Sequence, residues 1–223
     1  MKDNLITIDG PAGAGKTTVS RELARRLGYT YVDTGALYRG VAWAVRTAGC
    51  AGGDDERIGA VCRSVSMYFT DTPRGLRFFV NGEDVSDAIR TQEITMLASA
   101  LSARAVVRDA LLGVQRRLGA EGNAIFEGRD MGTVVFPEAR FKFYLDADPE
   151  IRVLRRYKEL LEKGEDIRLE TVRQNMQKRD QDDSSRALAP LKPAPDAVRI
   201  DSTAMSLDQV IVVILEHISK RRK

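Results

Sequence analysis

The sequence predicts an α/β fold, in which helices cover both faces of a mainly parallel sheet. Three observations support this prediction. Short apolar runs bounded by turn residues alternate with amphipathic helical stretches, and the first run leads through a glycine-rich turn into a helix. Residues 66–86 break the alternation with a strand–turn–strand–turn–strand pattern. We therefore expect a single domain, residues 1–223, with a small antiparallel lobe inserted into it.

Five segments are candidates for the strands of the parallel sheet. They are short and apolar, and they cover residues 5–9, 29–33, 124–128, 141–147 and 197–201. Helices are expected between them. One begins near Leu37, and two others carry apolar residues at helical spacing within 94–101 and 107–118. Ligands of such sheets bind beyond the carboxyl ends of the strands, so one cleft could collect the motifs that follow these strands.

Three sets of residues predict where helices end or begin. Gly28 is placed to cap the first helix at its carboxyl end. Asp148-Pro149 combines an N-cap residue with a proline suited to the first turn. Ser206–Gln209 has the residue types of a capping box. Tyr38 and Trp43 are most simply core residues of their helix.

The inserted segment, Ser66–Ser86, contains two turn signals, Pro73–Gly75 and Asn81-Gly82. The runs that flank these turns have the length and composition of strands. The segment therefore predicts a small antiparallel sheet. The residues alone leave open whether the lobe binds a ligand or is a surface hairpin without a function of its own.

Composition limits the classes of protein to which the chain can belong. The net charge of +3 is too weak on its own to indicate a nucleic-acid partner. No apolar run reaches the roughly 18 residues that a membrane helix needs. Cys50 and Cys62 form no disulfide framework, and His217, the only histidine, has no metal-binding motif around it. We expect a cytoplasmic protein without a zinc site, a membrane contact or a nucleic-acid partner.

The stretch GPAGAGKT fits the pattern G-x-x-x-x-G-K-[ST] in the right context, between a buried strand and a helix. Glycines let backbone N–H groups turn toward phosphate oxygens, and the helix N-terminus adds positive potential. In this pattern the lysine reaches the β- and γ-phosphates, and the hydroxyl of Thr17 can bind Mg²⁺. The loop predicts a nucleoside triphosphate site but leaves kinase, GTPase, motor and sensor open. Its residues are Gly10, Pro11, Ala12, Gly13, Ala14, Gly15, Lys16, Thr17 and Thr18.

Arginines occur where a second phosphate-bearing molecule would need them. Arginine suits phosphate because its planar fork pairs bidentately and keeps its charge. The positions are Arg39 after DTGALY, Arg129 directly past a predicted strand, Arg152, Arg155 and Arg156 on one helix face, and Arg179 and Arg186 at helical spacing around Asp183. Each of them could also be a solvated arginine on a helix surface. Together they favour a phosphate cleft.

With these motifs the chain resembles the bacterial cytidylate kinases over essentially its whole length. The segments that carry the resemblance are ITIDGPAGAGKTT, DTGALYRGVAW, GEDVSDAIRTQEIT, VRDALLGVQRRL, EGRDMGTVVFPEA, FYLDADPEIRVLRR and KRDQDDSSRALAPLKPAPDAVRIDST. The glycine-rich loop is common to many proteins, whereas GRDMGTVVFP, RTQEIT and APLKPAPDA are specific. The family phosphorylates CMP and dCMP with ATP and Mg²⁺. The resemblance implies a P-loop NTPase-type sheet, a monophosphate-binding lobe over about 64–104 and a short lid over about 150–186.

The resemblance also implies roles for individual residues. Thr34 would lie near the monophosphate and its sugar, and Arg179 and Asp183 would contact the ribose. The clamp on the CMP phosphate would consist of Arg39, Arg129 and Arg186. The cytosine readers would be Ser99, Arg108 and Asp130. The lid arginines near the transferring phosphoryl group would be Arg152, Arg155 and Arg156, with Lys16 and Arg129 as further catalytic residues.

Three other classes of nucleotide-binding protein share part of this pattern. A shikimate kinase is disfavoured by the antiparallel insert, the GRD motif and the absence of a triple-glycine turn. Asp130 and Arg108 favour cytosine over the bases of AMP, UMP and dTMP. A non-catalytic nucleotide-binding module would not need a second phosphate cleft. A nucleic-acid ATPase would need a long basic stripe or an aromatic stacking series, and the sequence has neither. The sequence therefore predicts a monomeric kinase that uses Mg²⁺ and ATP to phosphorylate CMP and dCMP.

Overall fold

A computed structural model describes residues 4–73 and 75–222 of the chain. The chain divides into two compact units. Met1–Asp33 and Gly119–Lys223 form the first, here called the sheet unit. Thr34–Leu118 forms the second, here called the helical unit. Each unit is described separately.

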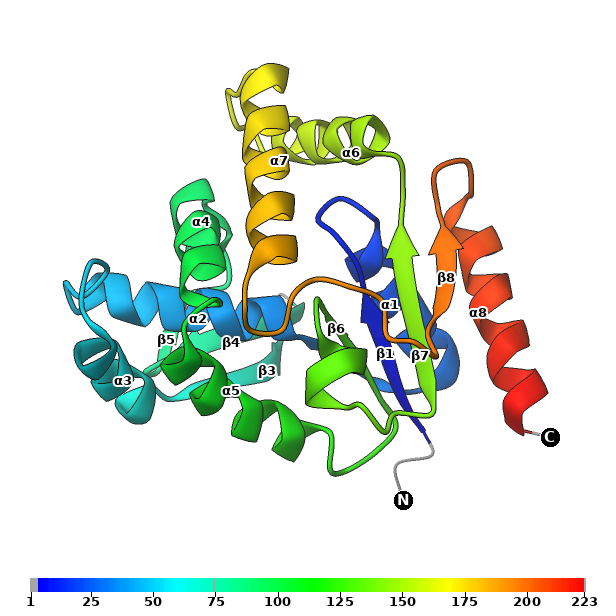
Figure 1. Cartoon of the computed structure of the whole chain (residues 1–223), viewed down its shortest axis with the longest axis horizontal. Coiled ribbons are helices and arrows are strands. Elements are labelled where there is room, and N and C mark those ends of the chain that lie inside the picture. The colour runs from blue at the N-terminus through cyan, green and yellow to red at the C-terminus, as the bar shows by residue number, and fades with distance from the viewer. Residues whose placement is uncertain (1–3, 74, 223) are drawn as a thin grey trace. The chain divides into compact units, whose positions relative to one another are not determined.

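The sheet unit is built on five strands in the order β2-β6-β1-β7-β8, and every neighbouring pair is parallel (Figure 1). The parallel five-stranded sheet predicted from the sequence is confirmed. The strands are β1 (Leu5–Asp9), β2 (Thr30–Asp33), β6 (Ala124–Gly128), β7 (Phe141–Asp146) and β8 (Val198–Asp201). In β1 and β6 all five residues are buried, as strands covered on both faces require.

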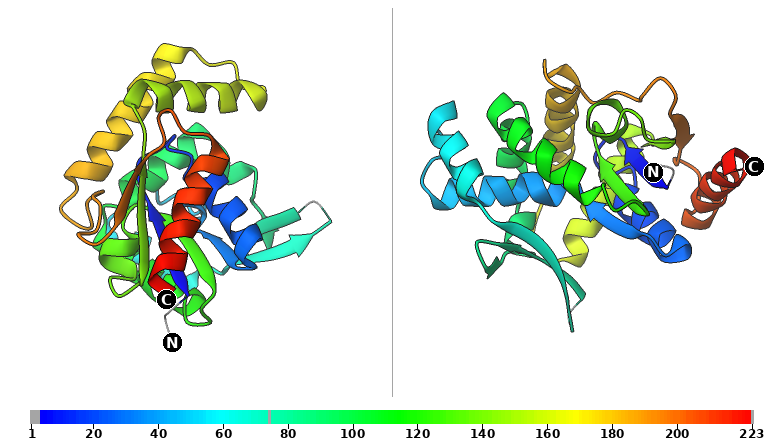
Figure 2. Two further views of the ribbon diagram at one scale, coloured as in Figure 1. Left: turned by 90° about the vertical axis from the view of Figure 1, so that its right-hand side faces the viewer. Right: turned by 90° about the horizontal axis from the view of Figure 1, so that it is seen from below.

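The helices of the sheet unit are α1, α6, α7 and α8, together with a short π-helical turn, η2. Their bounds are α1 (Lys16–Leu27), η2 (Met131–Val135), α6 (Pro149–Glu162), α7 (Leu169–Ser185) and α8 (Leu207–Arg222). Helices α1 and α8 pack against the same apolar face of the sheet (Figure 2). Ile6, Ile8 and Phe143 from the sheet meet Leu23 and Ile211 from these helices. Helices α6 and α7 share a separate apolar cluster.

The predicted helix ends are confirmed. Gly28 has a left-handed φ of 67° and caps α1 with a backbone N–H to the carbonyl of Ala24. The Asp148 carboxylate accepts from the first amides of α6. At α8, Ser206 N donates to Gln209 Oε1 (2.8 Å) and Gln209 N donates to Ser206 Oγ (3.3 Å), which is the reciprocal pair of a capping box.

The helical unit contains four α-helices and a short 3₁₀ turn among its described residues. They are α2 (Thr34–Thr47), α3 (Asp55–Ser64), η1 (Ala88–Arg90), α4 (Gln92–Leu101) and α5 (Ala105–Leu118), with the N-terminal pair α2 and α3 packed together. Helix α2 begins at Thr34, three residues before the expected Leu37, because the apolar spacing that marked it begins only inside the helix.

The predicted antiparallel sheet of the insert is confirmed in the helical unit. Strands β3 (Met67–Thr72), β4 (Gly75–Val80) and β5 (Glu83–Asp84) pair in the order β3-β4-β5. The second predicted turn has Asn81 at φ 51° and Gly82 at φ 83°, as a tight hairpin turn requires. The first predicted turn includes residue 74, which lies outside the described residues. The insert boundaries of about 64–104 stay a prediction.

Within the described ranges, the structure contains no helix that is both long enough and apolar enough to cross a bilayer.

The first glycine of the phosphate loop is fixed by the sheet itself. Gly10 follows β1 with φ 147°, and a Cβ there would lie 1.9 Å from the carbonyl oxygen of Leu145 in β7. Gly15 also has a positive φ (88°), but a Cβ there would meet no atom within 4 Å. At Gly10 a larger residue would therefore clash with the backbone of β7, whereas at Gly15 it would only strain its own backbone.

We expect Gly10→Ala to lower the free energy of unfolding by more than about 4 kcal/mol, because a backbone carbonyl occupies the space of the new methyl group. This corresponds to a fall in Tm of about 10 °C or more. Gly15→Ala is the matched control and should cost only the strain of a left-handed alanine, about 1–2 kcal/mol. Urea and thermal unfolding measure both. Equal losses for the two variants would contradict the steric explanation.

Candidate functional site

The glycine-rich loop joins the end of β1 to the start of α1. Gly10, Gly13 and Gly15 all have positive φ values, of 147°, 74° and 88°. The N-cap of α1 is Gly15, so no side chain occupies the first amides of the helix. These amides are available to an anion, and the helix dipole favours negative charge at this end. The loop has the conformation that the sequence pattern predicts.

Lys16 is the first residue of α1 and is buried, with 7% of its surface exposed. Its Nζ donates to the carbonyl of Pro11 at 2.6 Å, which folds the side chain over the loop. Burial lowers the pKa of Lys16 below its usual range, and the charges of Arg129 and Arg179 lower it further. A bound phosphate would favour the charged ammonium again. The lysine is therefore held where its charge needs an anionic partner.

Oxygen ligands gather beside Thr17. Its Oγ1 donates to Glu127 Oε1 at 2.8 Å, and Glu127 lies at the end of β6. Burial raises the pKa of Glu127, and the neighbouring carboxylate of Asp33 raises it further. A hydroxyl and carboxylates are the donors that Mg²⁺ prefers, so these residues fit a magnesium ion that enters with a nucleotide. Within the described ranges, no group of three or more His, Cys, Asp or Glu side chains is arranged to hold a metal by itself.

Three of the predicted arginines surround one buried carboxylate. The Asp183 side chain is 5% exposed, and its Oδ2 lies 3.0 Å from Arg129 Nε. Arg186 Nη1 lies 3.7 Å from Oδ1, and Arg179 Nε lies 4.0 Å from Oδ2. We call these four residues the Asp183 cluster. Burial would raise the pKa of Asp183, but the three guanidiniums outweigh it and hold that pKa below its ordinary value.

The three predicted lid arginines of α6 have different partners. Arg152 is buried and donates to the carbonyls of Ala147 (3.1 Å) and Ala12 (3.2 Å), which ties α6 to the glycine-rich loop. It also pairs with Asp180 of α7. Arg155 donates to Ser202 Oγ (3.0 Å) and to the Ser202 carbonyl (2.7 Å).

Arg156, the third of these arginines, pairs with Glu159 of its own helix at 2.8 Å. The one-face spacing read from the sequence therefore does not bring the three guanidiniums to one point. Only that of Arg152 contacts the glycine-rich loop through a hydrogen bond among those described.

Four predicted site residues lie in the helical unit. Thr34 is buried at the start of α2, and Arg39 lies on the same helix. The Ser99 Oγ of α4 is buried and has no hydrogen-bond partner among the described residues. Arg108 Nη1 donates to the Ser102 carbonyl at 3.2 Å, and Ser102 Oγ donates to the Ser99 carbonyl at 2.7 Å. The structure thus brings two of the three predicted cytosine readers together.

The ring of Tyr38 also belongs to this part of the helical unit. The Arg108 guanidinium lies over it, 5.9 Å from the ring centroid. Tyr38 packs against the core of the unit, as expected, and it also contacts a predicted base reader. Asp130, the third predicted reader, is buried in the sheet unit.

Sequence reasoning missed Asp9, which is the last residue of β1. Its carboxylate accepts from the backbone amides of Met131 (2.9 Å) and Gly132 (2.8 Å), directly after Arg129 and Asp130. Burial raises the pKa of Asp9 to about 6. A carboxylate that ends an otherwise apolar strand was the available signal. Asp180 and Ser202, the partners of Arg152 and Arg155, were missed as well.

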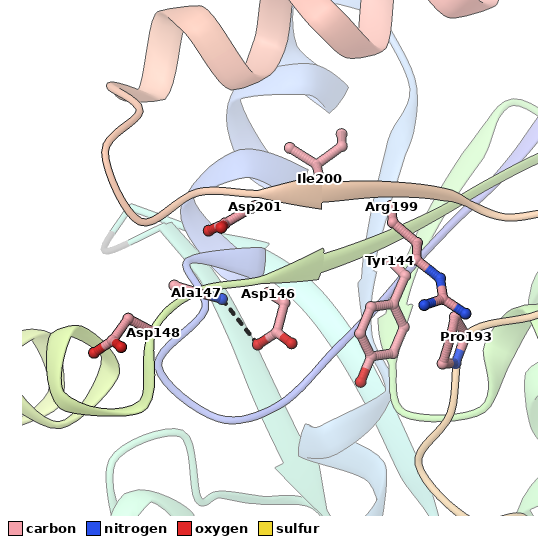
Figure 3. Close-up of a pocket in the computed structure, with 8 residues that line it drawn as sticks. All are labelled: Tyr144, Asp146, Ala147, Asp148, Pro193, Arg199, Ile200 and Asp201. Carbon is pink, nitrogen blue, oxygen red and sulfur yellow. Dashed lines mark hydrogen bonds between the residues drawn. The ribbon is translucent and has the colours of Figure 1, made fainter.

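A cavity of about 460 Å³ lies over the ends of β7 and β8 (Figure 3). Its lining consists of Tyr144, Asp146, Ala147, Asp148, Pro193, Arg199, Ile200 and Asp201. None of the predicted site residues is among these eight. Three of the carboxylates order the local backbone, since Asp146 accepts from Ala147 N, Asp148 from Glu150 N and Asp201 from Thr203 N. The cavity therefore lies outside the predicted site.

Comparisons with known proteins identify the family of the chain. Residues 6–220 match the sequence profile of the family described as Cytidylate kinase. A protein named Cytidylate kinase from Geobacter sp. (strain M21) is 46% identical over 217 residues, which are 97% of this chain and 93% of that protein. Another of the same name from Geobacter sulfurreducens is 49% identical over 93% of this chain and 89% of that protein.

One solved structure has a similar fold. An uncharacterized protein from Eubacterium ventriosum superposes with a TM-score of 0.50 at 12% identity, covering 97% of this chain and 99% of that chain. This similarity concerns the fold alone.

We expect Asp183→Asn to destabilise the protein by about 3 kcal/mol at pH 7, because it removes the buried carboxylate that three guanidiniums share. The pKa of Asp183 is lowered by folding, so its contribution to stability is present above its ordinary pKa and is lost as the pH falls through the lowered one. The difference in the free energy of unfolding between the variant and the wild type should therefore stay constant from pH 8 to 5 and decrease below pH 4. Urea unfolding at several pH values measures it.

Asp182→Asn is the matched control. The Asp182 carboxylate, next to Asp183 in the sequence, is exposed and pairs only with Lys178 among the described ion pairs. It should change stability by less than about 0.5 kcal/mol. The described role of the carboxylate would be refuted if Asp183→Asn lost no more stability than Asp182→Asn. A stability loss for Asp183→Asn that increases in acid would refute it as well.

Proposed function

The chain belongs to the cytidylate kinase family, and on that premise we propose how its residues perform the family's reaction. The protein is an ATP-dependent kinase that phosphorylates CMP and dCMP to CDP and dCDP. The observation that most supports this assignment for the present chain is the Asp183 cluster. It gathers three guanidiniums in the same unit as the glycine-rich loop.

The donor nucleotide is assigned to the glycine-rich loop. The amides at the start of α1 and the ammonium of Lys16 would bind the β- and γ-phosphates. Mg²⁺ would enter with ATP, and Thr17 would be its protein ligand, with Glu127 beside it to accept from metal-bound water. When bound there, the ion would supply charge neutralisation for the phosphoryl oxygens. Arg152, through its contact with the Ala12 carbonyl, keeps α6 against the loop.

The acceptor phosphate is assigned to Arg129 and Arg186, with Arg39 of the helical unit as the third member of the clamp. Arg129 and Arg186 are held by the Asp183 carboxylate, so their forks are ordered before a phosphate arrives. Bidentate pairing with a dianion then costs little side-chain entropy. Arg179 and Asp183 are proposed to contact the ribose, and Thr34 to lie near the phosphate and sugar.

The base is assigned to Ser99, Arg108 and Asp130. Cytosine offers an N4 amino donor and N3 and O2 acceptors, which a carboxylate or hydroxyl and an arginine complement. The buried Ser99 Oγ, without a partner among the described residues, has hydrogen-bonding capacity left for a ligand. Uracil would place its O4 acceptor against the Asp130 carboxylate. Discrimination against UMP follows from this mismatch.

The chemical step needs alignment and charge neutralisation more than proton transfer. An oxygen of the CMP phosphate forms a bond to the γ-phosphorus while the bond from that phosphorus to the β,γ-bridging oxygen breaks, and ADP leaves. The second pKa of a phosphate monoester is about 6, so the acceptor is already anionic near neutral pH and no general base is required. Lys16 and Arg129 would stabilise the transferring group, and Arg155 and Arg156 would need to leave Ser202 and Glu159 to join them.

Several expectations from the sequence remain proposals. We propose a monomer that acts on free nucleotides, without a nucleic-acid partner, in the cytoplasm. Light scattering coupled to size-exclusion chromatography addresses the oligomeric state.

We expect ADP formation from MgATP to be fast with CMP and dCMP and at least about 10-fold slower with UMP, because one charge-assisted hydrogen bond to the base is replaced by repulsion. AMP and dTMP should be poor acceptors. The measurement is a coupled ADP assay with each acceptor in turn. Equal rates with CMP and UMP would remove Asp130 as the discriminator. ATP binding without turnover on any acceptor would favour a non-catalytic nucleotide-binding module.

The same assay on Arg129→Ala tests the clamp. Turnover should fall by about 100-fold or more, because a charge-neutralising group is lost from the reacting phosphate. Arg173→Ala is the matched control, since that guanidinium pairs with Glu150 and Glu170 on exposed helix surface. A folded Arg129→Ala protein with normal activity would rule out this role.

A further inference from the structure

Asp9 is a buried carboxylate to which the reaction assigns no part. It is the last residue of β1, only 3% exposed, and Gly10 of the phosphate loop follows it directly. The backbone of Asp9 is held on both sides, because it pairs with Gly128 in β6 and with Tyr144 in β7. Its position is therefore fixed by the sheet and does not depend on its side chain.

The side chain of Asp9 binds the turn that follows Arg129 and Asp130. Oδ1 accepts from Met131 N at 2.9 Å and Oδ2 accepts from Gly132 N at 2.8 Å. These are the first amides of η2, where helical turns leave N–H groups without partners in the turn itself. The same turn closes on Asp130, whose carbonyl accepts from Val134 N at 2.9 Å. Both carboxylate oxygens of Asp9 are thus used to hold one backbone turn.

The turn packs closely against the residues around Asp9. A Cβ on Gly132 would lie 3.0 Å from Thr7 Oγ1 and 3.4 Å from Asp9 Oδ2. Glycine lets the backbone of the turn approach the carboxylate. The negative charges of Asp9 and Asp130 also lie close enough to raise the pKa of Asp9, although burial has the larger effect.

From this arrangement we infer that Asp9 is a positioning residue for the acceptor nucleotide. Its two hydrogen bonds fix the position of the Arg129–Asp130 turn relative to the phosphate loop. The groups that bind the acceptor are thereby held at a fixed position relative to the donor phosphates. The inference rests on the proposed acceptor roles of Arg129 and Asp130. It predicts that loss of these hydrogen bonds weakens acceptor binding and turnover and leaves donor binding nearly intact.

Asp9→Asn tests the inference, because the amide keeps the shape of the side chain but presents an NH₂ donor to one of the two backbone amides. At pH 8 we expect the Kd of CMP to rise about 10-fold or more. We expect kcat for CMP to fall about 10- to 100-fold, as for a small misplacement of a reacting group. The Kd of a non-hydrolysable ATP analogue should change less than about 3-fold. Calorimetric titration gives both dissociation constants.

Two outcomes would overturn the inference. A folded Asp9→Asn protein with wild-type CMP affinity and kcat, even at a lower Tm, would make Asp9 merely structural. Equal losses of CMP and ATP-analogue affinity would place its effect on the phosphate loop instead. Asp54→Asn is the matched control, since that carboxylate also accepts from a backbone amide, Arg57 N at 2.9 Å, at the start of α3.

Gly132→Ala provides a second route if Asp9→Asn does not fold. It keeps the carboxylate, but it places a methyl group 3.0 Å from Thr7 Oγ1 and 3.3 Å from Lys142 Cδ, so the turn must shift away from Asp9. The same selective loss of CMP affinity is expected, and unchanged CMP affinity would count against the inference. Wild-type protein in the same assays separates the two proposals, because failure of the wild type to phosphorylate CMP would refute the proposed function itself.

Discussion

The buried carboxylate of Asp183 allows three guanidiniums to lie close to one another. Two positive charges about 4 Å apart repel by about 4 kcal/mol at the effective dielectric constant of a protein surface, so the cluster would otherwise separate. One carboxylate compensates only one of the three charges that Arg129, Arg179 and Arg186 carry. In the proposed function, the positive charge that Asp183 leaves uncompensated on Arg129 and Arg186 is available to the phosphate dianion of the acceptor.

The sheet supplies the second constraint, because the functional segments follow the carboxyl ends of adjacent parallel strands. The phosphate loop follows β1, and the Arg129–Asp130 turn follows β6, its hydrogen-bonded neighbour. The close approach of Gly10 to the Leu145 carbonyl fixes where the loop leaves the sheet. Catalysis by alignment requires such fixed starting points, since small displacements of reacting groups cost large factors in rate.

Features set by local sequence were predicted well, and those set by distant contacts were not. The phosphate loop, the five strands and the caps at Gly28, Asp148 and Ser206 depend on residues within a few positions of one another. The bond of Asp9 to the 131–132 amides joins residues more than a hundred positions apart, and the five-residue π turn has no periodicity to reveal it. Helical spacing placed Arg152, Arg155 and Arg156 on one helix face, but it could not identify their partners in the glycine-rich loop, at Ser202 and at Glu159.

Our central proposal is that Arg129 and Arg186, which the Asp183 carboxylate holds, bind the acceptor phosphate. Calorimetric titration of the wild-type protein with CMP and with cytidine at pH 8 tests this claim most directly, because the two ligands differ only in the phosphate. CMP should bind about 100-fold or more tightly than cytidine, as expected if the phosphate gains charge-assisted hydrogen bonds to arginine. Affinities within about 3-fold of each other would contradict the claim, because a phosphate held by arginines cannot be energetically neutral.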